Sequence, residues 1–583
     1  MPRKPVPCLL IVGLIALSLF SIHAISYGTP IPQNADEYSY LLMAKTFVSG
    51  RLENPSHPMR AHFDNFHAIN EPSFASKYPP AQGFILAIGL FFFGSPIVGV
   101  WLSGAAACLG TFWMLRAFCD RKWAFLGTLM TLTFPIVFAW STAYFLGFAA
   151  LNGIMLCLGA LFRLTRRIKI GHSVIFGLGI AILSNSRPWE GLLACVPLSV
   201  FILIWLFGRI KDREFVRRAG LKFIVPVAAV LAVNFGWMVF YNFQVTGDPL
   251  KMPYQVYNRQ YDPIPLFLPL LSPPPFDEDF RQRAKEDFLQ NQITRSRIMR
   301  EFHLYEFDNF YFKTLSRYIE KDRSNLFVFL SKRAFFTFKS LLWITFYVYC
   351  LILIAGICLY SKSRRFLFCF GALVFCFLVN SFATYQQPHY YAPFFGFFCA
   401  AFVFVLSRTS RLNSRLNRFV TALAVAIILM QGYFIFTSRH ITDKATKYKN
   451  WEVQAVFEKF LYELPGNHLV LIDYSNANFL KGDRYLWITN RSYFNEPDID
   501  ASRIVWANSL DKQSDKKLFD YFKDRDVWVL GFGDADLKSE NFYDSDARNL
   551  YPKIISCEGR ESRFPPDETL KNALQRSCPG LNN

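Results

Sequence analysis

Long apolar runs separated by short polar and basic stretches fill the first three quarters of the chain. Most are about 15 to 25 residues long, near the roughly 20 that a helix needs to cross a bilayer's hydrocarbon core. A soluble helical protein would show one-faced periodicity and more charge between its helices. We therefore predict a polytopic α-helical membrane protein with these candidate spans: Cys8–Tyr27, Pro80–Phe93, Ile97–Phe118, Trp123–Trp140, Phe145–Phe162, Val174–Leu183, Leu192–Phe207, Phe223–Tyr241, Ala334–Tyr360, Phe366–Phe382, Tyr391–Leu406 and Phe419–Phe436.

Basic residues gather in four of the short loops, which predicts that these loops are cytoplasmic. The loops follow Phe162, Phe207, Tyr360 and Leu406. Arg3 and Lys4 predict a cytoplasmic N-terminus, with a retained anchor favoured over a cleaved signal peptide. The turns near Arg187, Tyr241 and His389 and everything after Phe436 are then expected outside.

This charge pattern conflicts with the number of candidate spans. Twelve crossings from a cytoplasmic N-terminus would return the C-terminus to the cytoplasm. We therefore expect about 11–13 crossings, with one candidate that does not cross or one crossing that the apolar runs do not reveal. Pro80–Phe93 is short and begins with proline, so it is a half-buried or re-entrant candidate.

The chain is expected to divide into a membrane module, residues 1–437, and an extracytoplasmic α/β domain, residues 438–583. Residues 28–78 and 242–333 are the outer segments of the module. In the second domain His468–Ser475 and Asp526–Asp534 have the pattern of buried strands, and Asp515–Asp524 that of an amphipathic helix. Cys557 and Cys578 are a plausible disulfide pair if this region is outside the cytoplasm.

Composition narrows the choice of partners. Charged residues make up 18% of the chain, below the roughly 25% of soluble domains. The formal net charge is +19, but the basic residues lie where loops meet lipid headgroups. Membrane lipids are therefore the expected partner, and nucleic acid is not.

Two groups of ionisable residues interrupt apolar sequence on the predicted outer face. Asp36 and Glu37 follow the first run, in "IPQNADEYSY", where a carboxylate can act as a general base, bind a divalent cation or simply be solvated. Arg187 and Glu190 lie in "SNSRPWEGLL". Arg187 has the fork geometry that binds phosphate, and Glu190 can orient Arg187 or bind a hydroxyl group of a ligand. The alternative is a structural Arg–Glu pair.

The first outer segment resembles that of the GT-C glycosyltransferases, integral-membrane enzymes that use polyprenyl-phosphate sugars. It reads "DEYSYLLMAKTFVSGRLENPSHPM" from Asp36 and ends "FASKYPPAQGFILAIGLFFFGSP". The closest pattern is that of glycosyltransferase family 39, with protein O-mannosyltransferases and lipid A aminoarabinose transferases, and it covers about the first 240 residues. An acidic residue after the first span matches Asp36 and Glu37. A Lys-Pro-Pro-like element matches Lys77, with Tyr78 intervening before the prolines.

The resemblance implies roles for these residues. Asp36 would be the catalytic base or metal-organising acid, Glu37 its partner, and Lys77 a ligand of the donor phosphate, unless Lys77 is only a snorkelling interfacial lysine. In "YQQPHYYAPFF", His389 is a weaker candidate for the phosphate, and Tyr390 and Tyr391 for the substrate. An aromatic interfacial belt explains these rings equally well.

Two further groups are less specific. The spacing of His57, His62, Asp64 and His67 is compatible with a metal site, but separate roles are favoured because the four do not share a helix face. Asp248–Tyr261 is basic and aromatic, and is either an acceptor wall or ordinary loop packing.

One departure from the family concerns metal. Several relatives carry a second acidic motif, but the comparable stretch Trp140–Asn152 has no acid. We therefore predict no metal site and no cofactor, with a divalent cation as the remaining alternative.

The expected function is transfer of a monosaccharide from a polyprenyl-phosphate donor to a cell-envelope acceptor, which is a glycan, lipid or protein hydroxyl. The resemblance implies the outer face of a bacterial inner membrane, with the C-terminal domain in the periplasm. A lipid transporter or flippase and an inactive scaffold are the alternatives. Ionisable residues concentrated at one face favour the transferase.

Overall fold

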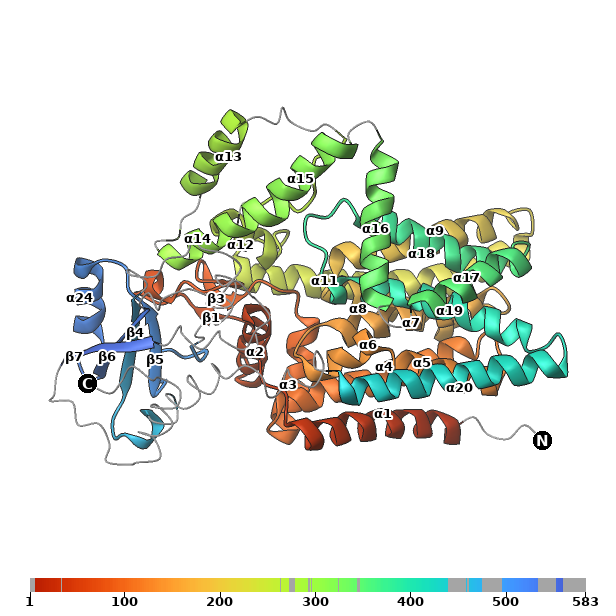
Figure 1. Ribbon diagram of the computed structural model, residues 1–583, viewed down its shortest axis with the longest axis horizontal. Coiled ribbons are helices and arrows are strands. Elements are labelled where there is room, and N and C mark those ends of the chain that lie inside the picture. Colours follow the sequence, from red (N-terminus) through yellow and green to blue (C-terminus); the bar gives the residue numbers. More distant parts are fainter. Residues whose placement is uncertain are drawn as a thin grey trace.

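The computed structural model describes residues 6–32, 34–262, 264–271, 278–291, 294, 296–322, 325–342, 346–438, 458, 461–473, 495–532 and 552–558. A long helical bundle carries a small sheet beyond one end, here called the sheet end (Figure 1). The bundle contains α1 (Val6–Tyr27), α4 (Pro96–Leu115), α5 (Arg121–Leu132), α6 (Pro135–Ala139), α7 (Gly147–Leu164), α8 (Ile170–Ser186), α9 (Pro188–Phe207), α10 (Arg213–Ala219), α11 (Val225–Thr246), α16 (Leu326–Leu342), α17 (Phe346–Tyr360), α18 (Arg364–Asn380), α19 (Ala392–Thr409) and α20 (Ser414–Thr437).

In the described ranges, seven helices are long and apolar enough to cross a membrane, or eight if one bent pair counts as a single span. The bent pair is α5 and α6, which meet at 59°. Pro135 at the start of α6 explains the break, because proline removes a helical hydrogen bond and restricts the residue before it. Three shorter apolar helices accompany them: Ala81–Phe93, Ile170–Ser186 and Tyr347–Tyr360.

Two predicted spans have different bounds in the structure. The expected single span Ala334–Tyr360 is wrong, because α16 and α17 are separate helices and α16 runs across the bundle direction (Figure 1). The expected span Phe223–Tyr241 is only the middle of a longer helical stretch, Arg213–Thr246.

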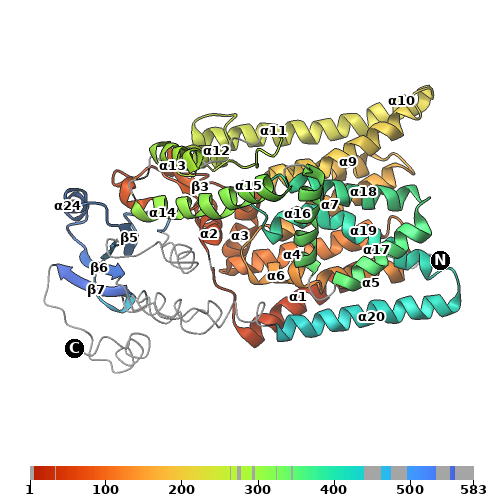
Figure 2. The same ribbon diagram turned by 45° about the horizontal axis from the view of Figure 1, so that its top comes forward.

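Helix α3 (Ala81–Phe93) is a 13-residue helix that folds back onto α4 at Gly94, whose φ is 65°. The two helices touch backbone to backbone, and a Cβ on Gly99 would lie 1.9 Å from the carbonyl oxygen of Ile85. Only glycine permits this approach, as in other membrane-helix contacts built on small residues. The close hairpin keeps α3 with α2 (Ala35–Val48) at the sheet end (Figure 2). Ala81–Phe93 is one of the shorter apolar helices, and a half-buried or re-entrant position for it stays a prediction.

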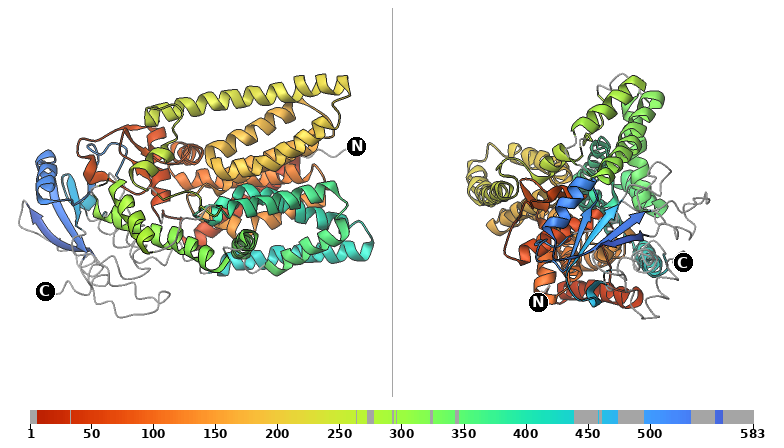
Figure 3. Two further views of the ribbon diagram at one scale, coloured as in Figure 1. Left: turned by 90° about the horizontal axis from the view of Figure 1, so that it is seen from above. Right: turned by 90° about the vertical axis from the view of Figure 1, so that its left-hand side faces the viewer.

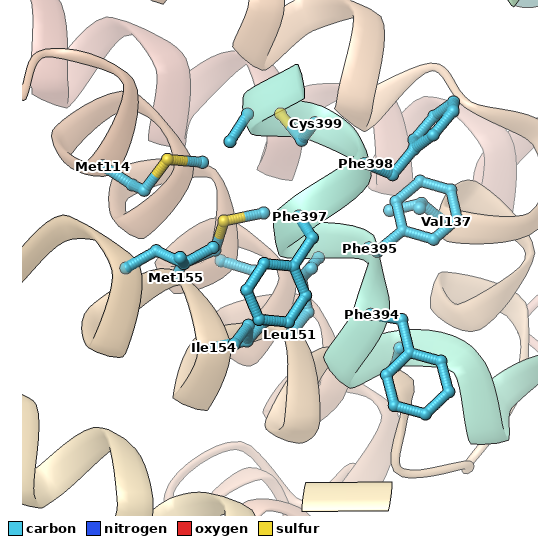
Figure 4. Close-up of a cluster of buried hydrophobic side chains, with 14 of the residues drawn as sticks. Met114, Val137, Leu151, Ile154, Met155, Phe394, Phe395, Phe397, Phe398 and Cys399 are labelled. Atoms are coloured by element: carbon cyan, nitrogen blue, oxygen red, sulfur yellow. The ribbon is translucent and has the colours of Figure 1, made fainter. Parts of the chain in front are cut away.

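Helix α19 forms the centre of the bundle. In the apolar 18-residue stretch of Pro388–Thr409, 94% of the residues are buried, whereas the corresponding share in Arg213–Thr246 is 6%. The phenylalanine rings of α19 point in several directions. Phe394, Phe395, Phe397 and Phe398 pack among residues such as Met155 from other helices (Figure 4). A helix that is apolar on all sides is expected in the interior, and one with an open apolar surface at the lipid.

The sheet end carries two sheets and several short helices. A small antiparallel sheet has the order β1-β3-β2, and the C-terminal sheet has the order β5-β4-β6-β7, with β4 parallel to β5 and β6 (Figure 3). The remaining elements are β1 (Asn54–Pro55), β2 (Ala68–Ile69), β3 (Ser73–Ser76), α12 (Pro253–Gln260), α13 (Glu278–Asn291), α14 (Arg297–Glu306), α15 (Lys313–Arg317), β4 (His468–Asp473), β5 (Ile504–Asn508), α24 (Lys512–Tyr521), β6 (Asp526–Phe532) and β7 (Pro552–Glu558).

The two strands and the helix predicted for the C-terminal region are confirmed as β4, β6 and α24. Cys578 and the side chain of Cys557 lie outside the described residues, so their disulfide stays a prediction.

Candidate active site

Asp36 lies in the first turn of α2, which is capped by the Asn34 side chain. The Tyr78 hydroxyl donates a short hydrogen bond to its Oδ1, and His67 Nε2 lies 3.8 Å from the same oxygen. Burial alone would raise the pKa of Asp36, but neighbouring His67, the Tyr78 donor and the nearby Lys77 and His389 together outweigh burial and lower it. Asp36 is therefore an anion at neutral pH.

His67 supports Asp36 as a neutral ring. Burial and the charge of Lys77 lower the pKa of His67 to about 3. Its backbone carbonyl accepts the amide of Lys77, which ties the loop before β2 to the end of β3. From the sequence, His67 was a possible metal ligand with a separate role favoured, and the structure brings it to the first acidic motif.

Lys77 is 5% exposed, and its ammonium lies over three tyrosine rings. The Nζ is 4.2 Å from the ring centroid of Tyr257, 5.3 Å from that of Tyr254 and 5.5 Å from that of Tyr78. Burial lowers the pKa of Lys77, while Asp262 and Asp36 favour its charged form. Lys77 forms no ion pair with any residue that the structure describes, so its charge remains available to an anionic ligand.

Arg187 lies between α8 and α9, where it is the last cap of one helix and the first of the next. Its guanidinium stacks on Tyr390, with Cζ 4.1 Å from the ring centroid, and its Nε is buried without a hydrogen-bond partner in the described part of the chain. Glu190 lies one turn along α9 and interacts with Arg187 electrostatically. Tyr40 connects this group to Asp36, since its ring stacks on that of Tyr78 at 4.5 Å.

His389, Tyr390 and Tyr391, the three residues predicted from the motif "YQQPHYYAPFF", have different surroundings. The His389 ring stacks on that of Phe145, with the centroids 4.4 Å apart. His389 is also close enough to Asp36 to lower the pKa of that carboxyl. Tyr390 supports Arg187. Tyr391 is 1% exposed, and its ring packs against Phe377 and Phe394 in the bundle core.

Glu37 points away from its neighbour Asp36. It is 2% exposed, and its carboxylate accepts the backbone N–H of Tyr144 at 2.9 Å. The Tyr144 hydroxyl in turn donates to the carbonyl of Pro30 at 2.8 Å. Glu37 thus fastens the loop after α6 to the start of α2, which is a positioning contact.

We expect Glu37→Ala to lower the free energy of unfolding by about 1–3 kcal/mol, because the buried Tyr144 N–H loses its acceptor. Thermal melting of the purified protein in detergent measures this. Glu214→Ala, which removes an exposed acid paired with Arg218, is the matched control and should change stability by less than about 0.5 kcal/mol. Equal melting temperatures for the Glu37 variant and the wild type would contradict this role.

Three ionisable residues that sequence reasoning missed complete the site. Asp262, just after α12, faces His303 and Glu306 of α14. Burial raises the pKa of Asp262, raises that of Glu306 to about 8 and lowers that of His303 to about 4. The spacing "HLYE" on an amphipathic helix was the available signal, since residues three apart share a helix face.

The other histidines of the first outer segment fasten it to the C-terminal sheet. His57 Nε2 lies 3.0 Å from Asp500, and His62 Nδ1 lies 2.9 Å from the carbonyl oxygen of Asn508. Asp64 accepts hydrogen bonds from Asn70, Thr294 and Tyr261. These residues have separate roles, and their side chains do not meet as one metal site.

Comparison with known proteins gives a fold. No protein-family model matches the chain, and no curated protein matches it by sequence. The structure of ArnT from Cupriavidus metallidurans in the apo state aligns with 90% of this chain and 92% of its own, at 12% identity and a TM-score of 0.50. The oligosaccharyltransferase AglB from Archaeoglobus fulgidus, in complex with an inhibitory peptide and a dolichol-phosphate, aligns over 90% and 69% at 13% identity and a TM-score of 0.44. The similarity to ArnT confirms the architecture predicted from the sequence: the chain has the fold of that protein, a polytopic helical bundle with a small C-terminal sheet.

Proposed function

We propose that this protein transfers a monosaccharide from a polyprenyl-phosphate donor to a hydroxyl of a cell-envelope acceptor. The observation that carries the proposal is the buried Lys77 ammonium, surrounded by tyrosine rings and free of ion pairs within the described residues. Such a cation supports binding of an anion at the membrane surface, where the phosphate of a polyprenyl donor lies. We assign the sheet end to the outer face of a bacterial inner membrane.

Lys77 and Arg187 supply the positive charge that the reaction needs. When the glycosidic bond breaks, negative charge grows on the departing phosphate, and fixed cations in a dry site stabilise it strongly. Arg187 offers a fork of N–H donors that suits two phosphate oxygens, and its stacking on Tyr390 holds that fork in place. Lys77 acts as a compact charge on the same phosphate.

Asp36 is the proposed base. The contacts that the described residues make to its carboxylate involve Oδ1, and Oδ2 is the oxygen proposed to accept the proton of an acceptor hydroxyl. Removal of that proton as the hydroxyl attacks the anomeric carbon is general base catalysis, with inversion at that carbon. His389, Glu190 and the tyrosines near Lys77 are proposed to contact sugar and acceptor hydroxyls.

The experiment that tests the proposal is a transfer assay with purified full-length protein in detergent. Radiolabelled polyprenyl-phosphate mannose, glucose, arabinose and aminoarabinose are supplied in turn with envelope extract as acceptor. We expect label to reach the acceptor from one of these donors and not from the matching nucleotide sugar. No transfer from any donor by a protein that melts cooperatively would contradict the proposal and favour a transporter or an inactive relative.

A further inference from the structure

Asp262, His303 and Glu306 form a compact group of metal-ligating side chains. One ligand atom from each lies within 4.8 Å of the other two. The side chains of Asp262, His303 and Glu306 are 7%, 0% and 14% exposed. Asp262 comes directly after α12, while His303 and Glu306 lie on one face of α14. The group therefore joins two parts of the second outer segment beside Lys77.

The distances suit a tetrahedral ion. Zinc bonds of about 2.0–2.1 Å in a tetrahedron put neighbouring ligand atoms about 3.3 Å apart. His303 Nδ1 lies 3.4 Å from Glu306 Oε2 and 3.8 Å from Asp262 Oδ1. The Asp262 and Glu306 oxygens lie within 4.8 Å of each other, so the two carboxylates would have to move toward each other to share one ion.

Hydrogen bonds already orient each of these side chains. The Tyr257 hydroxyl lies 3.2 Å from Nε2 of His303, which directs Nδ1 toward the two carboxylates. The Ile264 N–H donates to Asp262 Oδ1 at 3.3 Å, and the Tyr385 hydroxyl donates to Glu306 Oε2 at 3.4 Å. Metal-binding imidazoles and carboxylates are commonly held by such outer partners.

The charge of the surroundings also favours a cation. Four carboxyl groups face two basic side chains in this part of the site: Asp36, Glu190, Asp262 and Glu306 against Lys77 and Arg187. Asp262 and Glu306 both favour the charged form of Lys77 electrostatically, but Lys77 forms an ion pair with neither. A divalent ion at the three ligands would give the Asp262 and Glu306 oxygens the directly bonded cation that Lys77 does not provide.

We propose that Asp262, His303 and Glu306 bind one divalent transition-metal ion, with zinc as the best fit. One imidazole and two carboxylates are a donor set for zinc or manganese, whereas magnesium and calcium prefer oxygen ligands alone. Three protein ligands leave a fourth position open beside Lys77. This site differs from the metal-free site expected from the sequence, and it does not depend on the proposed transfer reaction.

Metal binding by the full-length protein in detergent tests the proposal without any donor. The protein is stripped with a chelator and dialysed. It is then titrated calorimetrically with Zn²⁺, Mn²⁺ or Mg²⁺, and bound metal is counted by mass spectrometry. We expect one Zn²⁺ per chain, bound at least about 100-fold more tightly than Mg²⁺. His303→Gln and Glu306→Gln should each lower Zn²⁺ affinity about 100-fold, and Tyr257→Phe, which removes only an outer partner, about 10-fold.

Asp308→Asn is the matched control, because Asp308 lies two residues from Glu306 but pairs with Lys285 at 2.8 Å. It should bind Zn²⁺ as the wild type does. Absence of saturable binding to the wild type, or equal binding by His303→Gln, would overturn the proposal. A loss of binding in Asp308→Asn as large as that in His303→Gln would also overturn it. Melting of each variant in chelator shows that it is folded, so that lost binding reports the ligands.

Discussion

Asp36→Asn is expected to lower kcat for sugar transfer by about 10³-fold, near the middle of the range for loss of a general base. Asparagine keeps the size of the side chain, and its amide oxygen can still accept the hydrogen bond from Tyr78. What disappears is the negative charge that would take the proton of the acceptor hydroxyl. Donor affinity should change little, because Asp36 does not supply positive charge to the phosphate. Steady-state kinetics with the donor identified by the transfer assay separate kcat from KM.

The control for this variant is Asp248→Asn, which removes an exposed carboxylate paired with Lys251 at 2.9 Å. Its kcat/KM should stay within about two-fold of the wild type. The pH dependence of kcat is a second measurement. Because the pKa of Asp36 is lowered, its carboxylate stays ionised as the pH falls through the ordinary carboxyl range of about 4. Protonation of Asp36 should therefore limit the rate only below that range. Unchanged transfer by Asp36→Asn would remove Asp36 from the catalytic step.

Lys77→Met is expected to lower kcat/KM by about 10²–10³-fold, the usual effect of removing one electrostatic group that stabilises developing charge. Methionine retains an unbranched apolar chain against Tyr254 and Tyr257, so the packing of the tyrosine rings is largely kept. The ammonium serves the phosphate in the bound donor and more strongly as the bond breaks. Both a higher KM and a lower kcat are therefore expected.

Lys45→Met is the matched control, since Lys45 is a partly exposed lysine that pairs with Glu496. Its kinetics should remain within about two-fold of the wild type. A thermal melt of Lys77→Met is needed beside the kinetics, because a misfolded protein would also be inactive. A folded Lys77→Met with wild-type kcat/KM would show that the buried Lys77 ammonium has only a structural role among the tyrosine rings.

The positions of Asp36, Lys77 and Arg187 in one site could be anticipated from the chain. Each interrupts or borders an apolar run on the same predicted face, and ionisable groups there are costly unless they have a role. The contacts of Glu37 could not be predicted in this way. It is adjacent to Asp36 in sequence, but successive residues on a helix point about 100° apart, so Glu37 reaches the Tyr144 backbone instead.

The second outer segment was the larger omission. Asp262, His303 and Glu306 belong to a polar stretch whose pattern predicts only loop and helix, and their meeting requires α14 to pack beside the end of α12. The three tyrosines around Lys77 come from two segments more than 170 residues apart in sequence, so no local spacing identifies them. Tyr391 follows Tyr390 in sequence and was likewise predicted to bind substrate. In the structure Tyr391 packs in the bundle core instead.

By itself the sequence determined that this is a helical membrane protein, that ionisable residues gather on one face, and that β4, β6 and α24 form in the C-terminal region. Those features follow from local hydrophobicity and charge, which each segment carries on its own. Only the tertiary structure decided which helices are central, that α16 and α17 are separate, that α3 folds back on α4, and which polar side chains meet. These depend on contacts between distant segments, such as the glycine approach of α3 to α4, and local patterns do not encode their geometry.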